Sequence, residues 1–371
     1  MEFPFGGVYF DMNVTLPASP INQEIENLAR LYNVIQKEHP RSGDRIQIKV
    51  TNDAPETVSN NPKTHYEIEN GFGMKTYFGW IYYAGGHDNT KGAVTYIPAQ
   101  KILRKSHFFK WIIDKEFRHP YQKISQVMHE MILIPSILLL SKTLLPIHSS
   151  AVFDPKNEKL IVFSGSGGVG KTFLEMSFIL KDNFQFFSDD ILIIDDKLRG
   201  YVNLNWPKIY KYNVNQLPIL NRYVTSGILD KLHWRICQFN PLVKGGCRRK
   251  INPLLFRDEN TPTVKKIDEI YLLFNERIDT IHIDPLDPET FGMISLEIIK
   301  SEYKDLFTHL NYHKFNRLSL GFKPVYELSQ IGEKFIEIFK KNKGVSIYIV
   351  RIPYGTPPAE LYRTIKRKII A

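Results

Sequence analysis

Cysteine is scarce in this chain, which has 2 cysteines among its 371 residues. Cys237 and Cys247 cannot build a disulfide framework, so the sequence is typical of a protein made for a reducing compartment. The Cys-x₂-Cys pair of a structural zinc site is also missing, and His233 does not complete a ligand set at useful spacing. The sequence therefore indicates neither a disulfide-stapled fold nor a zinc site.

Long hydrophobic runs are missing as well. The most apolar stretch, Met131 to Leu145, is interrupted by Pro135 and Lys142. It falls short of the roughly 20 apolar residues that a membrane helix needs. The first seven residues lack the basic and apolar regions of a secretory signal. We therefore expect a cytoplasmic protein without a membrane span.

Acidic residues are outnumbered, with 39 Asp and Glu against 49 Lys and Arg, and the formal net charge is +10. This surplus favours acidic partners such as nucleotides, nucleic acid, acidic peptides or anionic lipid. An ordinary basic surface would have the same composition, so charge alone does not choose among these partners. Hydrophobic residues at 43% and charged residues at 24% argue against extensive disorder.

The order of predicted elements divides the chain near residue 125. Short β-rich runs at 45–50, 76–84 and 92–97 predict a small N-terminal sheet. Residues 121–145 predict mainly helix, with a kink or break at Pro135. From residue 148 onward strands alternate with helices. Strands are expected at 159–163, 184–187, 191–194 and 345–350, an apolar run lies at 270–274, and helices are expected at 173–180, 329–341 and 358–370. We expect an α/β protein with a β-rich domain over 1–125 and a P-loop domain over 126–371.

The most specific motif is a glycine-rich loop between a predicted strand and a predicted helix. It fits G-x-x-x-x-G-K-[ST] at every fixed position, with the residues Gly165, Ser166, Gly167, Gly168, Val169, Gly170, Lys171 and Thr172. The glycines let the backbone wrap phosphates, and the following helix directs the positive end of its dipole at the same charge. Lys171 should reach the terminal phosphates of a nucleoside triphosphate such as ATP, and the Thr172 hydroxyl should ligate Mg²⁺.

Asp189 and Asp190 form a pair of carboxylates soon after this loop. One carboxylate of such a pair can stay ionised on the metal while the other takes a proton from an attacking hydroxyl. Neighbouring like charges raise one pKa of the pair, which suits a base. Two other interpretations stay open. In one, the pair is an exposed acidic turn. In the other, Asp195 binds the metal in a conventional NTPase.

Three segments together resemble the HPr kinase-related family, which shares the PEP carboxykinase-like nucleotide-binding fold. Residues 145–152 are similar to its L-P-x-H-A-S-A-V strand, and residues 160–172 are similar to its strand and P-loop. Residues 187–191 are similar to its L-S-D-D-x segment. The order and spacing of the three carry the resemblance, which covers residues 125–275 well and the rest in outline.

The resemblance implies a role for each matching position. Lys171 would hold the β- and γ-phosphates, and Thr172 would ligate the metal. Asp189 would deprotonate the acceptor hydroxyl, and Asp190 would help to place Mg²⁺. His148 would lie beside the reacting phosphate and orient or neutralise it. The implied fold is a PEP carboxykinase-like P-loop core with a mixed sheet.

Some positions depart from the family pattern. The family loop usually has Ser where Gly167 and Thr172 stand. No E-x-R-G-type stretch of the bifunctional kinase/phosphorylases is found, so the resemblance does not extend to HPr as the acceptor or to reverse phosphorolysis. The late segment Arg248-Arg249-Lys250 resembles the family loosely. It could contact phosphate or the acceptor, or be an ordinary basic turn.

The leading hypothesis is an ATP-dependent kinase that transfers the γ-phosphoryl group to a hydroxyl acceptor. The acceptor could be a protein or peptide serine, a small molecule or a nucleic-acid hydroxyl, and the sequence does not choose among them. The alternative is a nucleotide-gated P-loop switch, or an NTPase without a phosphoacceptor. A homo-oligomer is compatible with every one of these hypotheses.

Overall fold

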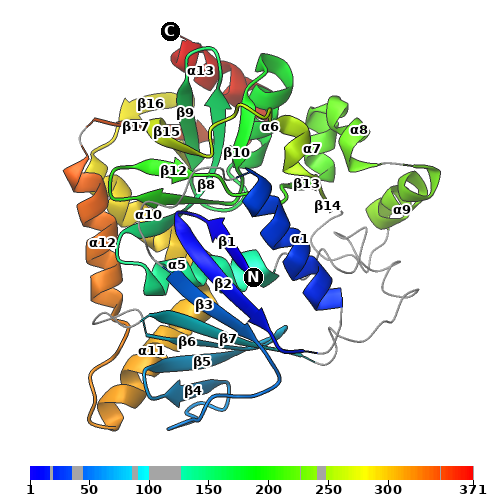
Figure 1. The fold of residues 1–371 in the computed structure, drawn as a ribbon. Helices are drawn as coiled ribbons and strands as arrows, with labels where there is room; N and C mark the ends of the chain where they lie inside the picture. Colours follow the sequence, from blue (N-terminus) through cyan, green and yellow to red (C-terminus); the bar gives the residue numbers. More distant parts are fainter. Residues whose placement is uncertain are drawn as a thin grey trace.

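The computed structural model describes residues 1–16, 20–35, 45–85, 91–99, 127–225, 227–239, 248–342 and 344–370. It is an α/β protein whose described strands form two large sheets of mixed direction and one small sheet. In Figure 1 the N-terminal sheet occupies the lower part of the molecule and the larger sheet the upper part. The short helix α5 (Ile134–Leu140) lies between them and contacts both.

The N-terminal sheet has seven strands in the order β1-β2-β3-β7-β6-β5-β4. The third strand in this order, β3, pairs in parallel with β2 and with β7, and the other neighbours pair antiparallel. Every second residue of β3 is buried, as expected for a strand with one face on a core. The strands are β1 (Glu2–Phe5), β2 (Val8–Val14), β3 (Arg45–Val50), β4 (His65–Ile68), β5 (Gly71–Thr76), β6 (Gly79–Ala84) and β7 (Gly92–Pro98).

The larger sheet has the order β10-β8-β11-β12-β15-β17-β16, and β9 pairs with both β8 and β15. The pairings therefore run from β8 through β11, β12, β15 and β9 back to β8, which closes a ring of strands. β15 pairs in parallel with β9 and with β17. The strands are β8 (Leu144–Asp154), β9 (Lys159–Ser164), β10 (Gln185–Ser188), β11 (Ile191–Asp195), β12 (Arg199–Tyr201), β15 (Val264–Glu276), β16 (His282–Pro285) and β17 (Ser346–Pro353).

Helices cover the sheets, and a small two-stranded ribbon lies at one side. α6 packs on β8 and β9, α13 packs on α6, and α10 packs on both β8 and α12. α11 lies on β4 and β5 of the N-terminal sheet, and α1 lies on β1. The ribbon consists of β13 (Lys208–Tyr210) and β14 (Arg248–Lys250). The helices are α1 (Pro20–Ile35), η1 (Met128–Leu133), α6 (Lys171–Asp182), α7 (Lys211–Gln216), η2 (Pro218–Leu220), α8 (Asn221–Val224), α9 (Ile228–Phe239), η3 (Pro253–Phe256), α10 (Pro288–Glu302), α11 (Lys304–Ser319), α12 (Leu328–Lys341) and α13 (Pro358–Ile370).

The expected elements are found with two corrections. The run 76–84 is not one strand, because β5 ends at Thr76 and β6 begins at Gly79, whose φ of +137° forms a turn. The helix predicted over 121–145 is also wrong at its end. Within the described residues it covers 128–140, and β8 already begins at Leu144 because that segment pairs with β11. The predicted boundary near residue 125 lies outside the described residues.

A buried polar cluster joins the N-terminal sheet to α11. Nε2 of His65 lies 2.7 Å from Oε1 of Glu67, and Nδ1 of His313 lies 2.9 Å from Oε2 of the same carboxylate. Nδ1 of His65 lies 3.0 Å from Nδ1 of His309, and the two imidazole rings stack. The Val325 N–H donates to Nε2 of His313, so Nδ1 of that ring carries the proton donated to Glu67. Burial opposes ionisation of Glu67, but hydrogen bonds from His313 and His65 lower its pKa.

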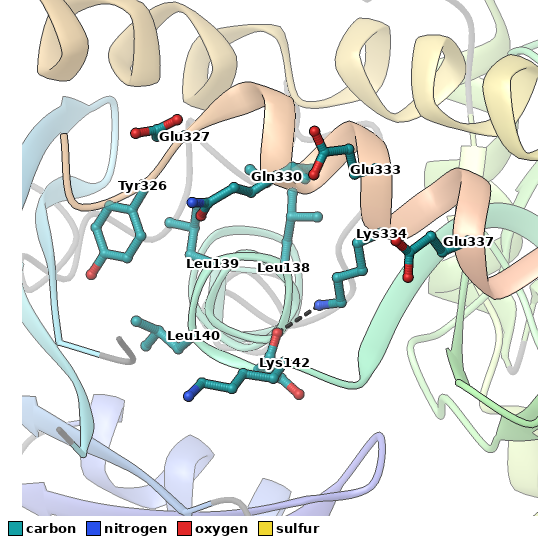
Figure 2. Close-up of a pocket in the computed structure, with 12 residues that line it drawn as sticks. Leu138, Leu139, Leu140, Lys142, Tyr326, Glu327, Gln330, Glu333, Lys334 and Glu337 are labelled. Atoms are coloured by element: carbon teal, nitrogen blue, oxygen red, sulfur yellow. Dashed lines mark hydrogen bonds between the residues drawn. The ribbon is translucent and has the colours of Figure 1, made fainter. Parts of the chain in front are cut away.

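A hollow of about 300 Å³ lies between the end of α5 and α12 (Figure 2). Leucines of α5 form its floor, and side chains of α12, including Glu333 and Glu337, project over it. Lys334 donates to the Ser141 carbonyl oxygen at 2.6 Å. The hollow contains none of the residues that the sequence marks for chemistry. Among the described residues, no helix is long and apolar enough to cross a membrane.

Candidate nucleotide-binding and catalytic site

The glycine-rich loop lies where the sequence predicts, between the end of β9 and the start of α6. Gly165 has a φ of +144°, and a Cβ on it would lie 2.7 Å from the Leu273 carbonyl oxygen of β15. A side chain there is therefore excluded by both conformation and space. Gly170, with a φ of +102°, is the N-cap of α6, and no side chain caps this helix end. The first backbone N–H groups of α6 are thus oriented as donors toward an anion.

Lys171 begins α6 and folds back over the loop. Its Nζ donates to the carbonyl oxygens of Gly165 and Ser166, both at 2.8 Å. The side chain is buried, and burial lowers its pKa, against the opposing effect of Asp190, Asp189 and Glu302. A buried ammonium held only by carbonyl oxygens is suited to bind a phosphate oxygen, which is a stronger acceptor.

Asp189 and Asp190 form the corner between β10 and β11. The Ile191 N–H donates to the Asp189 carbonyl oxygen at 2.9 Å, which closes a three-residue turn with Asp190 at its centre. Asp190 has a φ of +69°, a conformation that non-glycine residues rarely adopt. The Thr172 hydroxyl donates to Oδ1 of Asp189 at 3.1 Å. The corner therefore places a strained carboxylate pair directly beside the loop.

His148 reaches the same corner from β8. Its register partner on β11 is Ile191, and the Ser149 N–H donates to the Asp190 carbonyl oxygen. Nε2 of His148 lies 3.6 Å from Oδ1 of Asp190, and Nδ1 lies 3.0 Å from Oε1 of Glu302 at the end of α10. The contact with His148 lowers the pKa of Glu302. The imidazole is therefore placed between two carboxylates.

Lys208 of β13 neutralises the charge of Asp190, the second carboxylate of the pair. Its Nζ donates to Oδ2 of Asp190 at 3.1 Å and to Oε1 of Glu130 at 2.9 Å. Burial alone would raise the pKa of Asp190, but Lys208 and His148 outweigh it and lower that pKa. Burial and the charge of Asp190 raise the pKa of Asp189. The neighbouring groups thus shift the pKa values of the two carboxylates in opposite directions, as expected for a like-charged pair.

Glu175 is a further carboxyl group beside this site. It stands four residues after Lys171 on α6, its side chain is fully buried, and neither oxygen has a hydrogen-bond partner in the structure. Burial, together with the charge of Asp189, raises its pKa well above the ordinary value. Burial at this position therefore favours the protonated form of the carboxyl group. A lone glutamate in a helix gave no sequence signal for this position.

A cavity of about 730 Å³ is lined by the glycine-rich loop, the carboxylate pair and Glu302. One end is formed by the glycine-rich loop with Ile352 of β17, Leu361 of α13 and Thr356 in the turn between these two elements. The other end is formed by the ribbon and α7. The residues that line this second end are Lys208, Tyr210, Tyr212, Asn213, Gln216 and Arg248. His148, Asp189 and Asp190 also line the cavity, so the space passes from the loop across the carboxylate pair to the ribbon.

The described oxygen donors fit a magnesium ion. Mg²⁺ is usually held by one or two carboxylates and a hydroxyl together with phosphate oxygens, rather than by a protein cage. The Thr172 hydroxyl lies at the carboxylate corner, where it donates to Asp189 at 3.1 Å, and the pKa of the neighbouring Asp190 is lowered, which favours its ionised form. Over the described ranges no group of three or more His, Cys, Asp or Glu could hold a metal by itself. This set of donors therefore suits a metal that arrives with phosphates.

Asp195, the carboxylate of the conventional-NTPase alternative, lies at the other end of β11. Its oxygens accept from the backbone N–H groups of Lys197 and Arg199, from Arg199 Nε and from the Tyr201 hydroxyl. Its register partner on β8 is Leu144, whereas His148 pairs with the start of β11. It is not among the cavity-lining residues. Asp195 therefore has a structural role in the turn that follows β11.

The other partners of the site gave no local sequence motif. Glu302, Glu130 and Lys208 are far apart in the chain and meet only in the folded structure. Of the basic segment, Arg248 lines the cavity, whereas Arg249 points away from it. Arg249 lies beside Asp230 and over the Trp234 ring of α9.

Comparisons with known proteins add little to this geometry. No family model matches the chain, and no curated protein matches it. Among solved structures, the HPr(Ser) kinase/phosphatase from Coxiella burnetii matches 61% of this chain and 96% of its own. The identity is 10% and the TM-score 0.27. A TM-score this low does not assign a shared function, so the cavity geometry must support the proposals that follow.

Proposed function

We propose that the protein is an ATP-dependent kinase that transfers the γ-phosphoryl group to a hydroxyl acceptor. The observation that carries this proposal is the position of the carboxylate pair in the cavity. Asp189 contacts the P-loop through Thr172, and Asp190 contacts the ribbon through Lys208. A pure switch or a simple NTPase does not need a base between a phosphate cradle and a second, protein-lined space.

In the proposed reaction the acceptor oxygen attacks the γ-phosphorus, and the β,γ-bridging oxygen leaves with its electron pair on ADP. Asp189 accepts the hydroxyl proton, a role that its raised pKa supports. Lys171 leaves the loop carbonyl oxygens and neutralises the β- and γ-phosphates. His148 orients or neutralises the reacting phosphate. Thr172 and Asp190 would hold Mg²⁺, which when bound neutralises charge on the phosphates.

We further propose that this core has the PEP carboxykinase-like arrangement, and that residues 1–125 and 126–371 are its two domains. The two parts do not have separate hydrophobic cores. A single cluster of buried apolar side chains extends from β1 through α5 into β8 and β11. We therefore propose that the N-terminal part is a fixed support of the P-loop part.

The test is transfer of label from γ-labelled ATP in the presence of Mg²⁺ to the protein, RNA and small-molecule pools of a fractionated lysate. We expect label in one pool. Asp189→Asn should abolish transfer while ATP still binds, Lys171→Ala should lose both, and Asp190→Asn should weaken Mg²⁺-dependent binding. Asp195→Asn, made in a carboxylate outside the cavity, is the matched control for folding. Label released only as phosphate would favour an NTPase, binding without turnover would favour a switch, and transfer by Asp189→Asn would overturn the assigned base.

A further inference from the structure

The C-terminal end of α11 exposes large hydrophobic side chains. The outer face of a surface helix is usually left to polar residues. Here apolar and basic side chains are gathered between positions 314 and 323, and these seven residues are called the α11-end patch. The apolar members are Phe315 (60% exposed), Leu318 (58%), Leu320 (39%) and Phe322 (52%), and the basic members are Lys314, Arg317 and Lys323. A cluster of exposed apolar side chains rimmed by polar ones marks an interaction site.

The packing of α11 on the N-terminal sheet does not use the patch. His309, His313 and Asn316 lie on the buried face of the helix and bond to β4 and to the segment before it. Phe315 and Leu318 are three residues apart, and at about 3.6 residues per turn they share the opposite side of the helix. α11 is therefore anchored by its polar face, and the apolar side chains of the patch are left for another contact.

The end of α11 fixes the shape of the patch. Gly321 has a φ of +80°, its N–H donates to the Leu318 carbonyl oxygen at 3.1 Å, and the Phe322 N–H donates to the Arg317 carbonyl oxygen at 2.8 Å. These are the two hydrogen bonds of a Schellman motif. The Arg317 guanidinium lies over the Phe322 ring, 4.8 Å from its centroid. The apolar side chains are therefore presented by an ordered helix end.

The basic side chains of the patch have no acidic partner. Lys314 and Lys323 are exposed and make no ion pair within the part of the chain that the structure describes. Arg317 donates to the backbone carbonyl oxygens of Lys323 and Glu69, at 3.1 and 2.9 Å, which leaves its charge in place. Residues 311–324 contain neither Asp nor Glu. The patch is thus apolar and positively charged at once, and the charge calls for an anionic partner.

The size and composition of the patch favour a lipid surface over a folded partner. A stable protein interface takes roughly 20–30 residues from each side, and lysine is depleted in it. The patch has seven residues, two of which are unpaired lysines. Apolar side chains can enter the boundary of headgroups and acyl chains on this small footprint while Lys and Arg stay at anionic headgroups. A second copy docked through the same patch would bring like charges together.

The patch lies at the far end of α11 from the candidate site. α11 begins two residues after Glu302, which contacts His148, and its 16 residues span about 24 Å at 1.5 Å per residue. In Figure 1 α11 leads along the lower sheet, whereas α6 lies in the upper part of the molecule. A surface that binds the patch would therefore leave the nucleotide cavity open.

We propose that the α11-end patch docks the protein on an anionic membrane surface. Phe315 and Leu318 enter the boundary between headgroups and acyl chains. Lys314 and Lys323 lie beside them at the level of the anionic headgroups. The protein then lies on the membrane without spanning it, with its cavity turned away from the lipid.

The test is co-sedimentation of the full chain with lipid vesicles. One set contains phosphatidylcholine alone, and the other contains phosphatidylcholine and phosphatidylserine in equal parts. We expect binding to the mixed vesicles only, and weaker binding as salt is raised. Phe315→Gln/Leu318→Gln should weaken this binding about tenfold or more, because two apolar side chains no longer enter the bilayer. Lys314→Gln/Lys323→Gln should also weaken it about tenfold or more, because two charges at the headgroups are lost.

Matched controls separate the patch from the overall charge. Lys156→Gln/Lys197→Gln removes the same charge from exposed turns of the larger sheet, and Phe274→Gln removes an exposed phenylalanine of β15. Both should change vesicle binding less than about twofold, because only charges near the lipid contribute. Equal losses in control and patch variants, equal binding to the two kinds of vesicle, or no binding to the mixed vesicles would each overturn the proposal. So would a wild-type dimer in sedimentation velocity that Phe315→Gln/Leu318→Gln dissociates, because a second copy would then occupy the patch.

Discussion

Acidification should destabilise the protein through His309. Burial, assisted by the neighbouring His65, lowers the pKa of His309 from 6.5 to about 4. The unfolded chain therefore binds a proton at this position more readily than the folded chain does. Stability at this site is fully present above the unfolded pKa, is lost as the pH falls from 6.5 toward 4, and does not change further below that.

The magnitude follows from the difference of about 2.5 in pKa. At about 1.4 kcal/mol for each unit of pKa, His309 accounts for about 3 kcal/mol of unfolding free energy. About 2 kcal/mol of this is lost between pH 7 and pH 5, because the unfolded histidine is then almost fully protonated. Glu67 does not contribute in this window. Its lowered pKa places its own loss of stability below its ordinary range near 4.5.

The assay is urea unfolding of the wild type and of His309→Asn at pH 7 and at pH 5. Asparagine keeps a hydrogen-bonding amide near His65 but does not titrate. We expect the variant to lose about 2 kcal/mol less between the two pH values than the wild type loses. His282→Asn, in an exposed histidine, controls for removal of an imidazole and should keep the wild-type difference. An equal loss in His309→Asn and in the wild type would refute the reasoning.

Two further substitutions test the site itself. Gly165→Ala should weaken binding of the β,γ-imido analogue of ATP about tenfold or more, because the added Cβ would lie 2.7 Å from the Leu273 carbonyl oxygen. Gly167→Ala, where no backbone atom is that close, should change the affinity less than about twofold. Equal effects of the two substitutions in calorimetry would contradict this prediction. Lys208→Met should lower the free energy of unfolding by about 2 kcal/mol, because two largely buried carboxylates lose their cation. Lys300→Met, which breaks an exposed pair, should cost less than about 0.5 kcal/mol in the same urea titration, and similar losses in both would contradict the assignment.

Much of the fold could be predicted from local patterns. The alternation in 45–50 gave β3, and the apolar periodicity of 358–370 gave α13 with its observed bounds. α11 could not be predicted in this way. Its buried face carries His309, His313 and Asn316 in place of apolar residues, so the helical spacing of hydrophobic side chains is interrupted. His309 and His313 are buried against His65 and Glu67 of β4, whereas Asn316 is buried with hydrogen bonds to Ser59 and to the carbonyl oxygens of Asn61 and Tyr312.

The candidate site also combines residues that a local sequence pattern identifies with residues that meet only in the folded structure. The loop and the Asp189-Asp190 corner are continuous in sequence, so their chemistry could be inferred from spacing. Glu302 and Lys208 contact this corner from α10 and β13, and their roles depend on sheet and helix packing. From the sequence alone, Arg248 and Arg249 were equally good candidates for a contact with phosphate or the acceptor. Their alternation on β14 separates them, since adjacent residues of a strand face opposite sides.

The close approach of Gly165 to Leu273 has a consequence for synthesis of the nascent chain. The loop follows β9, but its backing strand β15 is completed about 110 residues later, at Glu276. At about 5–20 residues per second, the ribosome needs roughly 5 to 20 seconds to supply that strand. The N-terminal strands can pair during this interval, while the loop still lacks the surface that fixes its shape. Nucleotide capture during translation should therefore begin only after β15 has emerged from the exit tunnel.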